Sequence, residues 1–334
     1  MRRDINHLHH VGHVVRDMEE GLALYRRLGF HLSPPAYPML SPREGEPPRP
    51  FGATNTHANF PRSFVELVSC IDNDDPDRLP SDAKRIPLQA PPEHLARITE
   101  SIRSTVAKLA ACLARFQGLH ILVFETSDPD AAARRLSAEG VHHGGVITVR
   151  RPVDTANGTR MAPIRLLELD SPAPDEAATG SVAEGRIAIA ENPAAALLEA
   201  QPDIDHPNGA VDLVESVLCV AQAALPEVER RYEKYLGRPA RADGPARVFD
   251  LDGSRVTLVA DADLEAILPG ERAPALPAFV AYAVAVRDIG VARKLLEENG
   301  FPLKRSAPGD LFVPAAAALG AAILFRESAR RPTR

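Results

Sequence analysis

The same order of elements recurs four times along this 334-residue chain, and this repeat restricts the possible folds more than any other feature. Each unit begins with an apolar strand-like run, continues through a polar break and an amphipathic helix, and reaches a glycine. An Asp stands at the expected helix N-cap in three units, and a Gly stands at the expected left-handed C-cap in all four. The four opening runs are residues 10–17, 119–124, 214–220 and 279–286.

Further short runs typical of antiparallel strands follow each glycine, so each unit is predicted to fold as β-α-β-β-β. These runs are residues 53–60 and 64–69 in the first unit, 146–150, 164–169 and 186–190 in the second, 247–251 and 255–259 in the third, and 311–313 and 321–325 in the fourth. The pattern predicts an α+β fold built from four βαβββ modules.

Two segments lie outside the repeat. Residues 33–50 are rich in proline, which lacks the N–H that a strand ladder needs, so they are predicted to form a long stiff loop beside a site. Residues 72–118 begin with an acidic run, predicted to be a solvated loop. Apolar residues then recur at helical spacing from Leu95 to Leu113 and predict an amphipathic helix that connects the first two modules.

Three phrases link the chain to a known family: Gly52-Ala53-Thr54-Asn55-Thr56-His57, Phe64-Val65-Glu66-Leu67-Val68 and His206-Pro207-Asn208-Gly209-Ala210. With its four modules, the chain resembles the vicinal oxygen chelate superfamily of glyoxalases, bleomycin-resistance proteins and extradiol dioxygenases, and more narrowly the glyoxalase-like-domain proteins. The resemblance covers most of the chain and implies two paired half-barrel domains, residues 1–200 and 201–334. It also implies a cleft that binds a divalent metal through the first and last strands of each module.

Strand alternation selects candidate ligands for such a metal. Alternation places His10 on one face of the first strand and His9 and His13 on the other, and His120 occupies the matching place in the second module. Glu66 lies in the apolar closing strand of the first module, where a carboxylate is costly unless it is paired or metal-bound. His10, His120 and Glu66 are therefore the predicted ligands.

The second module offers two carboxylates for the remaining position. Counting strands favours Glu191 as the ligand, at the end of the run 186–190, and leaves Glu168 to transfer a proton. Glu168 lies in Leu-Leu-Glu-Leu, which is similar to the strand around Glu66, so the reverse assignment and a site without either stay open. His57 faces Glu66 if residues 61–62 form a hairpin turn, and it is a candidate ligand, partner of Glu66 or general base.

This set suits Fe, Mn, Ni or Zn, and the ligand types do not choose among these metals. The resemblance implies a metal-dependent enzyme that chelates two oxygens of a small oxygen-rich substrate in lyase, isomerase or glyoxalase-type chemistry. If only His10, His120 and one Glu bind the metal, the set suits Fe(II) and O₂, and a dioxygenase is the alternative. A metal-free protein that binds a drug or metabolite is a further alternative, weakened by an aromatic content of 5% without Trp.

The C-terminal modules differ from the N-terminal pair. Their first strands carry no His, and their closing strands carry no carboxylate predicted to be buried. These modules are therefore predicted to be structural or to enclose an emptied pocket.

Composition excludes other classes of protein. A net charge of −6 and a pI near 6.0 provide no basic surface for nucleic acid or an anionic membrane. No run approaches the roughly 18 apolar residues of a membrane span. Three cysteines without CxxC spacing indicate neither a disulfide framework nor a thiolate zinc site. We expect a cytoplasmic monomer or homodimer with a small-molecule substrate.

Overall fold

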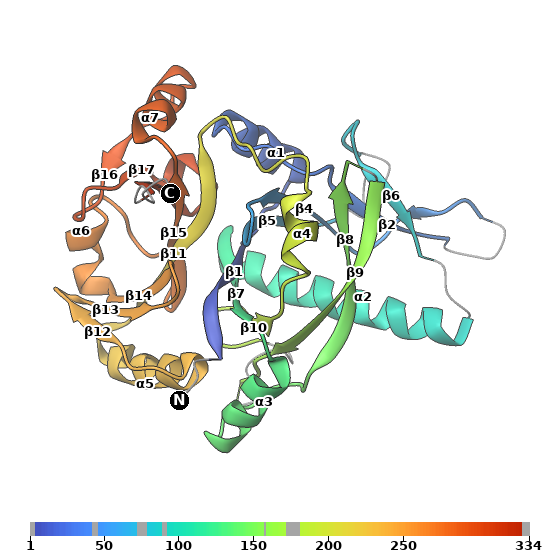
Figure 1. Cartoon of the computed structure of the whole chain (residues 1–334), viewed down its shortest axis with the longest axis horizontal. Coiled ribbons are helices and arrows are strands. Elements are labelled where there is room, and N and C mark those ends of the chain that lie inside the picture. Colours follow the sequence, from blue (N-terminus) through green and yellow to red (C-terminus); the bar gives the residue numbers. More distant parts are fainter. Residues whose placement is uncertain are drawn as a thin grey trace.

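All four βαβββ units are present in the computed structural model, which describes residues 4–41, 46–71, 79–88, 92–156, 158–171 and 181–328 (Figure 1). In each unit the first strand pairs in parallel with the last one, and the strands between them complete the unit through antiparallel pairs. The predicted α+β fold of repeated modules is confirmed.

The first unit contains β1 (Ile5–Val14), α1 (Met18–Arg27), β2 (Ala36–Leu40), β3 (Arg49–Pro50), β4 (Ala53–Asn59) and β5 (Phe64–Cys70). A connector follows with β6 (Lys84–Pro87) and α2 (Pro92–Arg115). The second unit contains β7 (Gly118–Thr126), α3 (Pro129–Ala138), β8 (Ile147–Thr155), β9 (Gly158–Glu168) and β10 (Arg186–Ala190). The short helix α4 (Ala195–Glu199) leads toward the C-terminal units and packs beside β8.

The third unit contains β11 (Ala210–Val220), α5 (Leu225–Leu236), β12 (Arg241–Asp243), β13 (Ala246–Asp250) and β14 (Arg255–Ala260). The helix α6 (Leu264–Ile267) connects it to the fourth unit, which contains β15 (Ala278–Val286), α7 (Ile289–Glu298), β16 (Lys304–Arg305), β17 (Leu311–Val313) and β18 (Ala322–Glu327). The predicted runs of these two units correspond to β11, β13, β14, β15, β17 and β18, and β11 begins earlier than predicted; β12 and β16 were not predicted.

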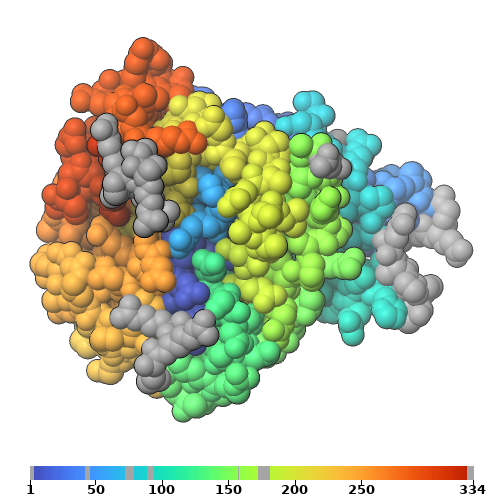
Figure 2. Space-filling model, in the orientation of Figure 1, coloured from blue at the N-terminus to red at the C-terminus, as the bar shows by residue number. Residues whose placement is uncertain are grey.

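The first strands of neighbouring units lie side by side and join the units. Strand β1 pairs antiparallel with β7, and β11 pairs antiparallel with β15. Strands up to residue 190 pair with one another, strands from residue 210 onward do the same, and Phe279 opposite Leu119 links the two sets. Figure 2 shows the segment that follows α4, in yellow, on the surface between the orange and red C-terminal units and the green strands.

The predicted helix caps hold in the structure. The carboxylates of Asp17, Asp128 and Asp288 accept hydrogen bonds from backbone N–H groups in the first turns of α1, α3 and α7. The glycine that follows each unit's helix has a positive φ, as for Gly237 at 61° after α5. These local signals explain why the repeat was readable from the sequence.

The prediction that residues 33–50 form only a loop is wrong, because β2 and β3 lie within them. Strand β2 pairs in parallel with β6, and Pro38 stands opposite Ile86. A proline removes only a donor: the carbonyl of Pro38 still accepts a hydrogen bond from the N–H of Phe51 (2.9 Å).

The predicted connector helix is confirmed as α2, which runs across the N-terminal sheet (Figure 1). Its Leu109 and Cys112 pack against β1, β5, β7 and β10, on the face opposite α1 and α3. Helix α2 therefore covers one end of the face that carries the candidate site. The acidic run 72–78 lies outside the described residues. Among the described helices, none is long and apolar enough to cross a membrane.

Candidate active site

A cavity of about 960 Å³ lies over the N-terminal sheet. Strands β1, β4, β5, β7 and β10 form its floor, and β2, β6, β8 and β9 contribute the walls. Much of the lining is apolar, including Ile121, Val123, Ile164, Leu166, Ala188 and Ala190. Such a cavity matches the size and largely apolar lining of small-molecule sites.

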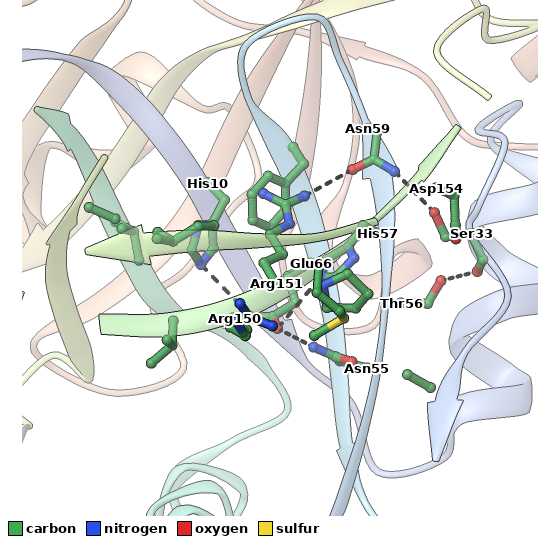
Figure 3. A pocket seen from close by; sticks show the side chains of 18 of the residues that line it. His10, Ser33, Asn55, Thr56, His57, Asn59, Glu66, Arg150, Arg151 and Asp154 are labelled. Carbon is green, nitrogen blue, oxygen red and sulfur yellow. Dashed lines mark hydrogen bonds and ion pairs between the residues drawn. The ribbon is translucent and has the colours of Figure 1, made fainter. Parts of the chain in front are cut away.

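The polar centre of the cavity is formed by His10, His57 and Glu66, which come from β1, β4 and β5 (Figure 3). The Nε2 atom of His10 lies 3.9 Å from Oε2 of Glu66, and Nε2 of His57 lies 3.9 Å from Oε1. The amide of Asn55 donates a hydrogen bond to the same Oε1 (3.0 Å). The sequence prediction that His57 stands opposite Glu66 is confirmed by the register of the β4–β5 hairpin.

The protonation states of this centre follow from its surroundings. Burial, with a smaller effect from nearby cations, lowers the pKa of His10 to about 3, and burial also lowers the pKa of His57. Burial alone would raise the pKa of Glu66, but the adjacent His57, His10 and Asn55 lower it to about 2. At neutral pH the site therefore presents an ionised carboxylate between two neutral imidazoles.

His9 also lines the cavity, contrary to the expectation that it points away from His10. The pairing of β1 with β7 shifts between Leu8 and His10, so His9 is an extra residue in a β-bulge and alternation fails there. The Nδ1 atoms of His9 and His10 lie 2.8 Å apart, which requires that one ring donate to the other. If His10 donates, its Nε2 keeps a free lone pair toward Glu66.

Phe64 fixes the two imidazoles of the centre, although the sequence did not single it out. Its ring stacks on His10 at 4.3 Å with an interplanar angle of 14° and contacts His57 edge-on at 4.9 Å. The guanidinium of Arg151 lies over the same ring, with Cζ 4.0 Å from the centroid. Phe64 stands two residues before Glu66 on β5, so strand alternation was the signal that could have identified it.

The expectation that His120 shares the cleft with His10 is wrong. His120 is buried away from the cavity, where Nε2 lies 2.9 Å from the carbonyl oxygen of Phe116 and the two rings pack at 4.1 Å. On β7 the cavity is lined by Ile121 and Val123 instead. His120 is itself an extra residue in a bulge of β7, because the pairing passes from Ile121 opposite Gly12 to Leu119 opposite His13. A match that is one residue off places a side chain on the opposite face.

The two carboxylates of the second module lie in different places. Strand β10 is the closing strand, as counting predicted, but Glu191 just beyond it is not among the residues that line the cavity. Its Oε1 accepts a hydrogen bond from the N–H of Arg165 (3.1 Å). The sequence prediction of Glu191 as a ligand in this cavity therefore finds no support in its position.

Glu168 does line the cavity, on β9, but two cations hold it. It forms an ion pair with Arg186, and Nζ of Lys108 lies 3.2 Å from its Oε2. Burial would raise the pKa of Glu168, whereas Arg186 and Lys108 outweigh burial and lower it. A general base at neutral pH needs the opposite shift. Proton transfer by Glu168 therefore stays a prediction without support from its surroundings.

The corresponding position in the C-terminal pair holds an ion cluster. Bulges at residues 9 and 214 align β1 with β11, so Glu215 matches His10 and Thr257 matches Glu66. Glu215 is buried, accepts a hydrogen bond from Thr257 (2.5 Å) and pairs with Arg255 (2.8 Å) and Arg326 (2.5 Å). The sequence missed this carboxylate, which lies on a first strand and not on a closing strand.

The donor types of the polar centre suit a divalent metal, since neutral imidazoles and an ionised carboxylate are its common ligands. Metal–ligand bonds of about 2.0–2.2 Å place two ligands of one ion at most about 4 Å apart. The separations of 3.9 Å from Glu66 to His10 and to His57 lie close to that limit. Within the described residues, no group of three or more His, Cys, Asp or Glu is arranged to hold an ion. Binding by all three side chains would therefore require them to draw together.

Comparisons with known proteins agree with this architecture. The sequence model of the glyoxalase-like domain family matches residues 8–236. No curated protein matches the chain. Among solved structures, a hypothetical protein from Staphylococcus aureus has a TM-score of 0.57 at 11% identity, over 97% of this chain and 100% of that one.

Two further structures share the fold at low identity. A triple mutant of 4-hydroxymandelate synthase from Streptomyces coelicolor has a TM-score of 0.55 at 15% identity, over 98% of this chain and 94% of that one. A fusion of a xylose isomerase-like TIM barrel with 4-hydroxyphenylpyruvate dioxygenase has a TM-score of 0.52 at 12% identity, over 99% of this chain and 50% of the fusion.

Proposed function

The chain belongs to the glyoxalase-like domain family, and on this premise we propose that it is an enzyme that acts on a small oxygen-rich molecule at His10, His57 and Glu66. The observation that carries the proposal is the ionised carboxylate of Glu66 between two neutral imidazoles on the floor of the cavity. Each imidazole faces its own carboxylate oxygen, and the rest of the floor is largely apolar. This arrangement concentrates the reactive polar groups at one point.

His10 and Glu66 would hold a divalent metal, with His57 beside them. When bound, the metal would act as a Lewis acid toward oxygens of the substrate. His9 fits this assignment in one tautomer: when Nδ1 of His10 donates to Nδ1 of His9, the Nε2 lone pair of His10 faces Glu66 and can bind the metal. Asn55 holds the carboxylate and Phe64 holds the ring of His10.

His57 is the proposed proton acceptor in lyase or isomerase chemistry. Its lowered pKa keeps the ring unprotonated at neutral pH, whereas Glu66, with a pKa of about 2, is too weak a base. This assignment differs from the sequence prediction for Glu168, since Glu168 is already held by Arg186 and Lys108.

A dioxygenase is the second candidate, and one observation favours it. His57 can take the role of second imidazole that the sequence had assigned to His120. His10, His57 and Glu66 then supply two imidazoles and one carboxylate. That set with open positions suits Fe(II) and O₂. The two candidates differ in the role of His57, which is a metal ligand in the dioxygenase and a proton acceptor in the lyase or isomerase.

Metal titration tests both candidates. Untagged protein is stripped with a chelator and titrated with Fe(II), Mn, Ni and Zn salts under anaerobic conditions, with uptake measured by elemental analysis. We expect one equivalent in the wild type and loss in His10→Ala and Glu66→Gln. His142→Ala, at an exposed position, is the matched control and should bind as the wild type does. Uptake in His10→Ala and Glu66→Gln equal to that of the wild type would refute the proposed site.

His57→Ala separates the two chemistries. It should retain metal if His57 is a proton acceptor, and it should lose most affinity if His57 is a ligand. Oxygen consumption by the Fe(II)-loaded protein then provides an independent readout for the dioxygenase. A protein that takes up no metal in any form and still binds small molecules in the cavity would support the metal-free binding function instead.

A further inference from the structure

Beyond the reaction class, we propose that the substrate of this cavity is a small carboxylic acid with an apolar body, whose carboxylate pairs with Arg151. The inference rests on the proposed function, since it places the substrate in the cavity that contains His10 and Glu66. It adds a recognition residue from the second module, which contributes no imidazole to the centre.

Arg151 is the feature that points to an anion. It extends from β8 into the cavity, lies over the ring of Phe64, and donates one hydrogen bond from Nη2 to Oδ1 of Asn59 (3.3 Å), which Figure 3 marks. Its Nε and Nη1 atoms are buried and have no hydrogen-bond partner among the described residues. Nε and Nη1 lie on different edges of the guanidinium, so a ligand at the end of the group meets Nη1 together with the second N–H of Nη2.

The charge of Arg151 is also uncompensated by direct contact. Other lining cations are already paired: Lys84 with Asp154 at 2.5 Å, and Arg186 with Glu168. By contrast, no described carboxylate lies within ion-pair distance of Arg151. Arg85 and Arg150 at the mouth of the cavity are exposed, so water solvates their charges.

Burial lowers the pKa of Arg151 to about 10, so the side chain remains a cation at neutral pH. A buried cation with unsatisfied donors is unfavourable unless an anion or acceptor approaches it. A carboxylate matches the end of the guanidinium and can accept in parallel from Nη1 and from the N–H of Nη2 that does not bond Asn59. One guanidinium with two free N–H groups suits a monoanion better than a phosphate dianion, which would need a second uncompensated cation.

The mouth of the cavity supplies the apolar contact. Ile86, Val149 and Met161 line it from β6, β8 and β9 and are 38%, 37% and 49% exposed. Large apolar side chains gathered and exposed at one opening mark a ligand surface more often than chance placement does. A ligand with its carboxylate at Arg151 can therefore extend an apolar body toward these three side chains.

Calorimetric titration of the full-length, metal-loaded protein tests the inference with three probes: 3-phenylpropanoate, its neutral amide 3-phenylpropanamide, and phenyl phosphate. Arg151→Met keeps the length and the contact with Phe64 but removes the charge, and Arg151→Lys keeps the charge without the fork. Arg160→Met, on an exposed residue of β9 that does not line the cavity, is the matched control. Thermal unfolding of each variant checks that it is folded.

We expect the wild type to bind 3-phenylpropanoate at least tenfold more tightly than the amide or phenyl phosphate. Arg151→Met should weaken the carboxylate about ten- to hundredfold, leave the amide within about twofold, and be rescued only in part by Arg151→Lys. Arg160→Met should bind as the wild type does. Equal affinity for acid and amide, tighter binding of the phosphate, or an Arg151→Met variant that binds the acid normally would each overturn the inference.

The same titration in His10→Ala separates this inference from the proposed function. Carboxylate binding that persists in His10→Ala and disappears in Arg151→Met supports the anion site even if metal uptake fails. Normal metal uptake without any preference for the carboxylate refutes the anion site and leaves the proposed metal centre intact.

Discussion

Replacing Glu215 by Gln should destabilise the C-terminal modules and leave the cavity unchanged. The carboxylate of Glu215 is 5% exposed and contacts Arg255, Arg326 and Thr257. The substitution keeps the shape of the side chain but leaves two guanidiniums facing each other without the charge between them. The cluster occupies the position that corresponds to the polar centre of the N-terminal pair. The variant therefore tests whether this position stabilises the fold in the C-terminal half and binds ligands in the N-terminal half.

The magnitude follows from the burial of the partners. Removing one member of a fully buried ion pair costs about 3–5 kcal/mol. Arg255 and Arg326 are 26% and 25% exposed, and Arg326 keeps Asp310 at 2.5 Å, so water and that pair recover part of the loss. We expect a decrease of about 2–4 kcal/mol in the free energy of unfolding, which lowers Tm by roughly 5–10 °C in a domain of this size.

The stability difference between wild type and Glu215→Gln should depend on pH, and its direction follows from the pKa of Glu215. Burial would raise the pKa of Glu215, but Arg255, Arg326 and Thr257 outweigh it and hold the pKa below the usual range. The ionised carboxylate therefore stabilises the fold above the unfolded pKa of about 4.3, and this contribution is lost as the pH falls through the folded pKa. The difference between wild type and Glu215→Gln should be full at pH 7 and shrink below about pH 4.

Thermal and urea unfolding measure the difference, and metal uptake and carboxylate binding should stay at wild-type values. Asp243→Asn is the control, because its pair with Arg241 is exposed to water and should contribute little to stability. A Glu215→Gln variant with a Tm within 1 °C of the wild type, or one that loses ligand binding while it remains folded, would refute the structural role of the cluster.

Gly12→Ala should lower the free energy of unfolding by about 1–3 kcal/mol, because an added Cβ would stand 2.6 Å from Cβ of Ile121 across the β1–β7 pair. Urea unfolding measures the loss, and adding Ile121→Gly to Gly12→Ala should relieve the clash. Glu168→Gln should reduce the loss of stability between pH 6 and pH 3, since Arg186 and Lys108 lower the pKa of Glu168 and its ionised form stabilises the fold only above the unfolded pKa. A wild-type acid-unfolding profile in Glu168→Gln would contradict this.

The repeat could be predicted because its signals are local. The Asp caps, the glycines after the helices and the apolar first strands each depend on a few neighbouring residues. The structure reproduces the Asp caps in three units and the glycines and first strands in all four. Strands β2 and β6 could not be predicted in the same way. They stabilise each other through pairing between segments far apart in the sequence, and the prolines within them mask the strand pattern.

The predictions for the candidate site also succeeded where the signal was local and failed where it was not. His57 opposite Glu66 followed from a two-residue turn, which fixes register locally. His9 and His120 were placed on the wrong faces because a bulge has no signature in the alternation pattern. Arg151 was missed because the β8–β9 hairpin extends beyond the predicted strand, and because only the folded cavity shows that its donors lack partners.

If His120 misses the cavity because of a bulge, a histidine placed on the face of β7 that lines the cavity should be able to bind the metal. Val123 lines the cavity and stands directly opposite His10 across the β1–β7 pair, so their Cβ atoms share one face at about 5 Å. Val123→His should therefore add a donor beside His10 and tighten metal binding at least tenfold, about 1.4 kcal/mol. Leu122→His, which points into the opposite core, should instead lower stability and leave metal affinity unchanged. Metal titration with parallel thermal unfolding distinguishes the two variants. Equal metal affinity in Val123→His and wild type would show that the second module cannot reach a metal at His10 and Glu66.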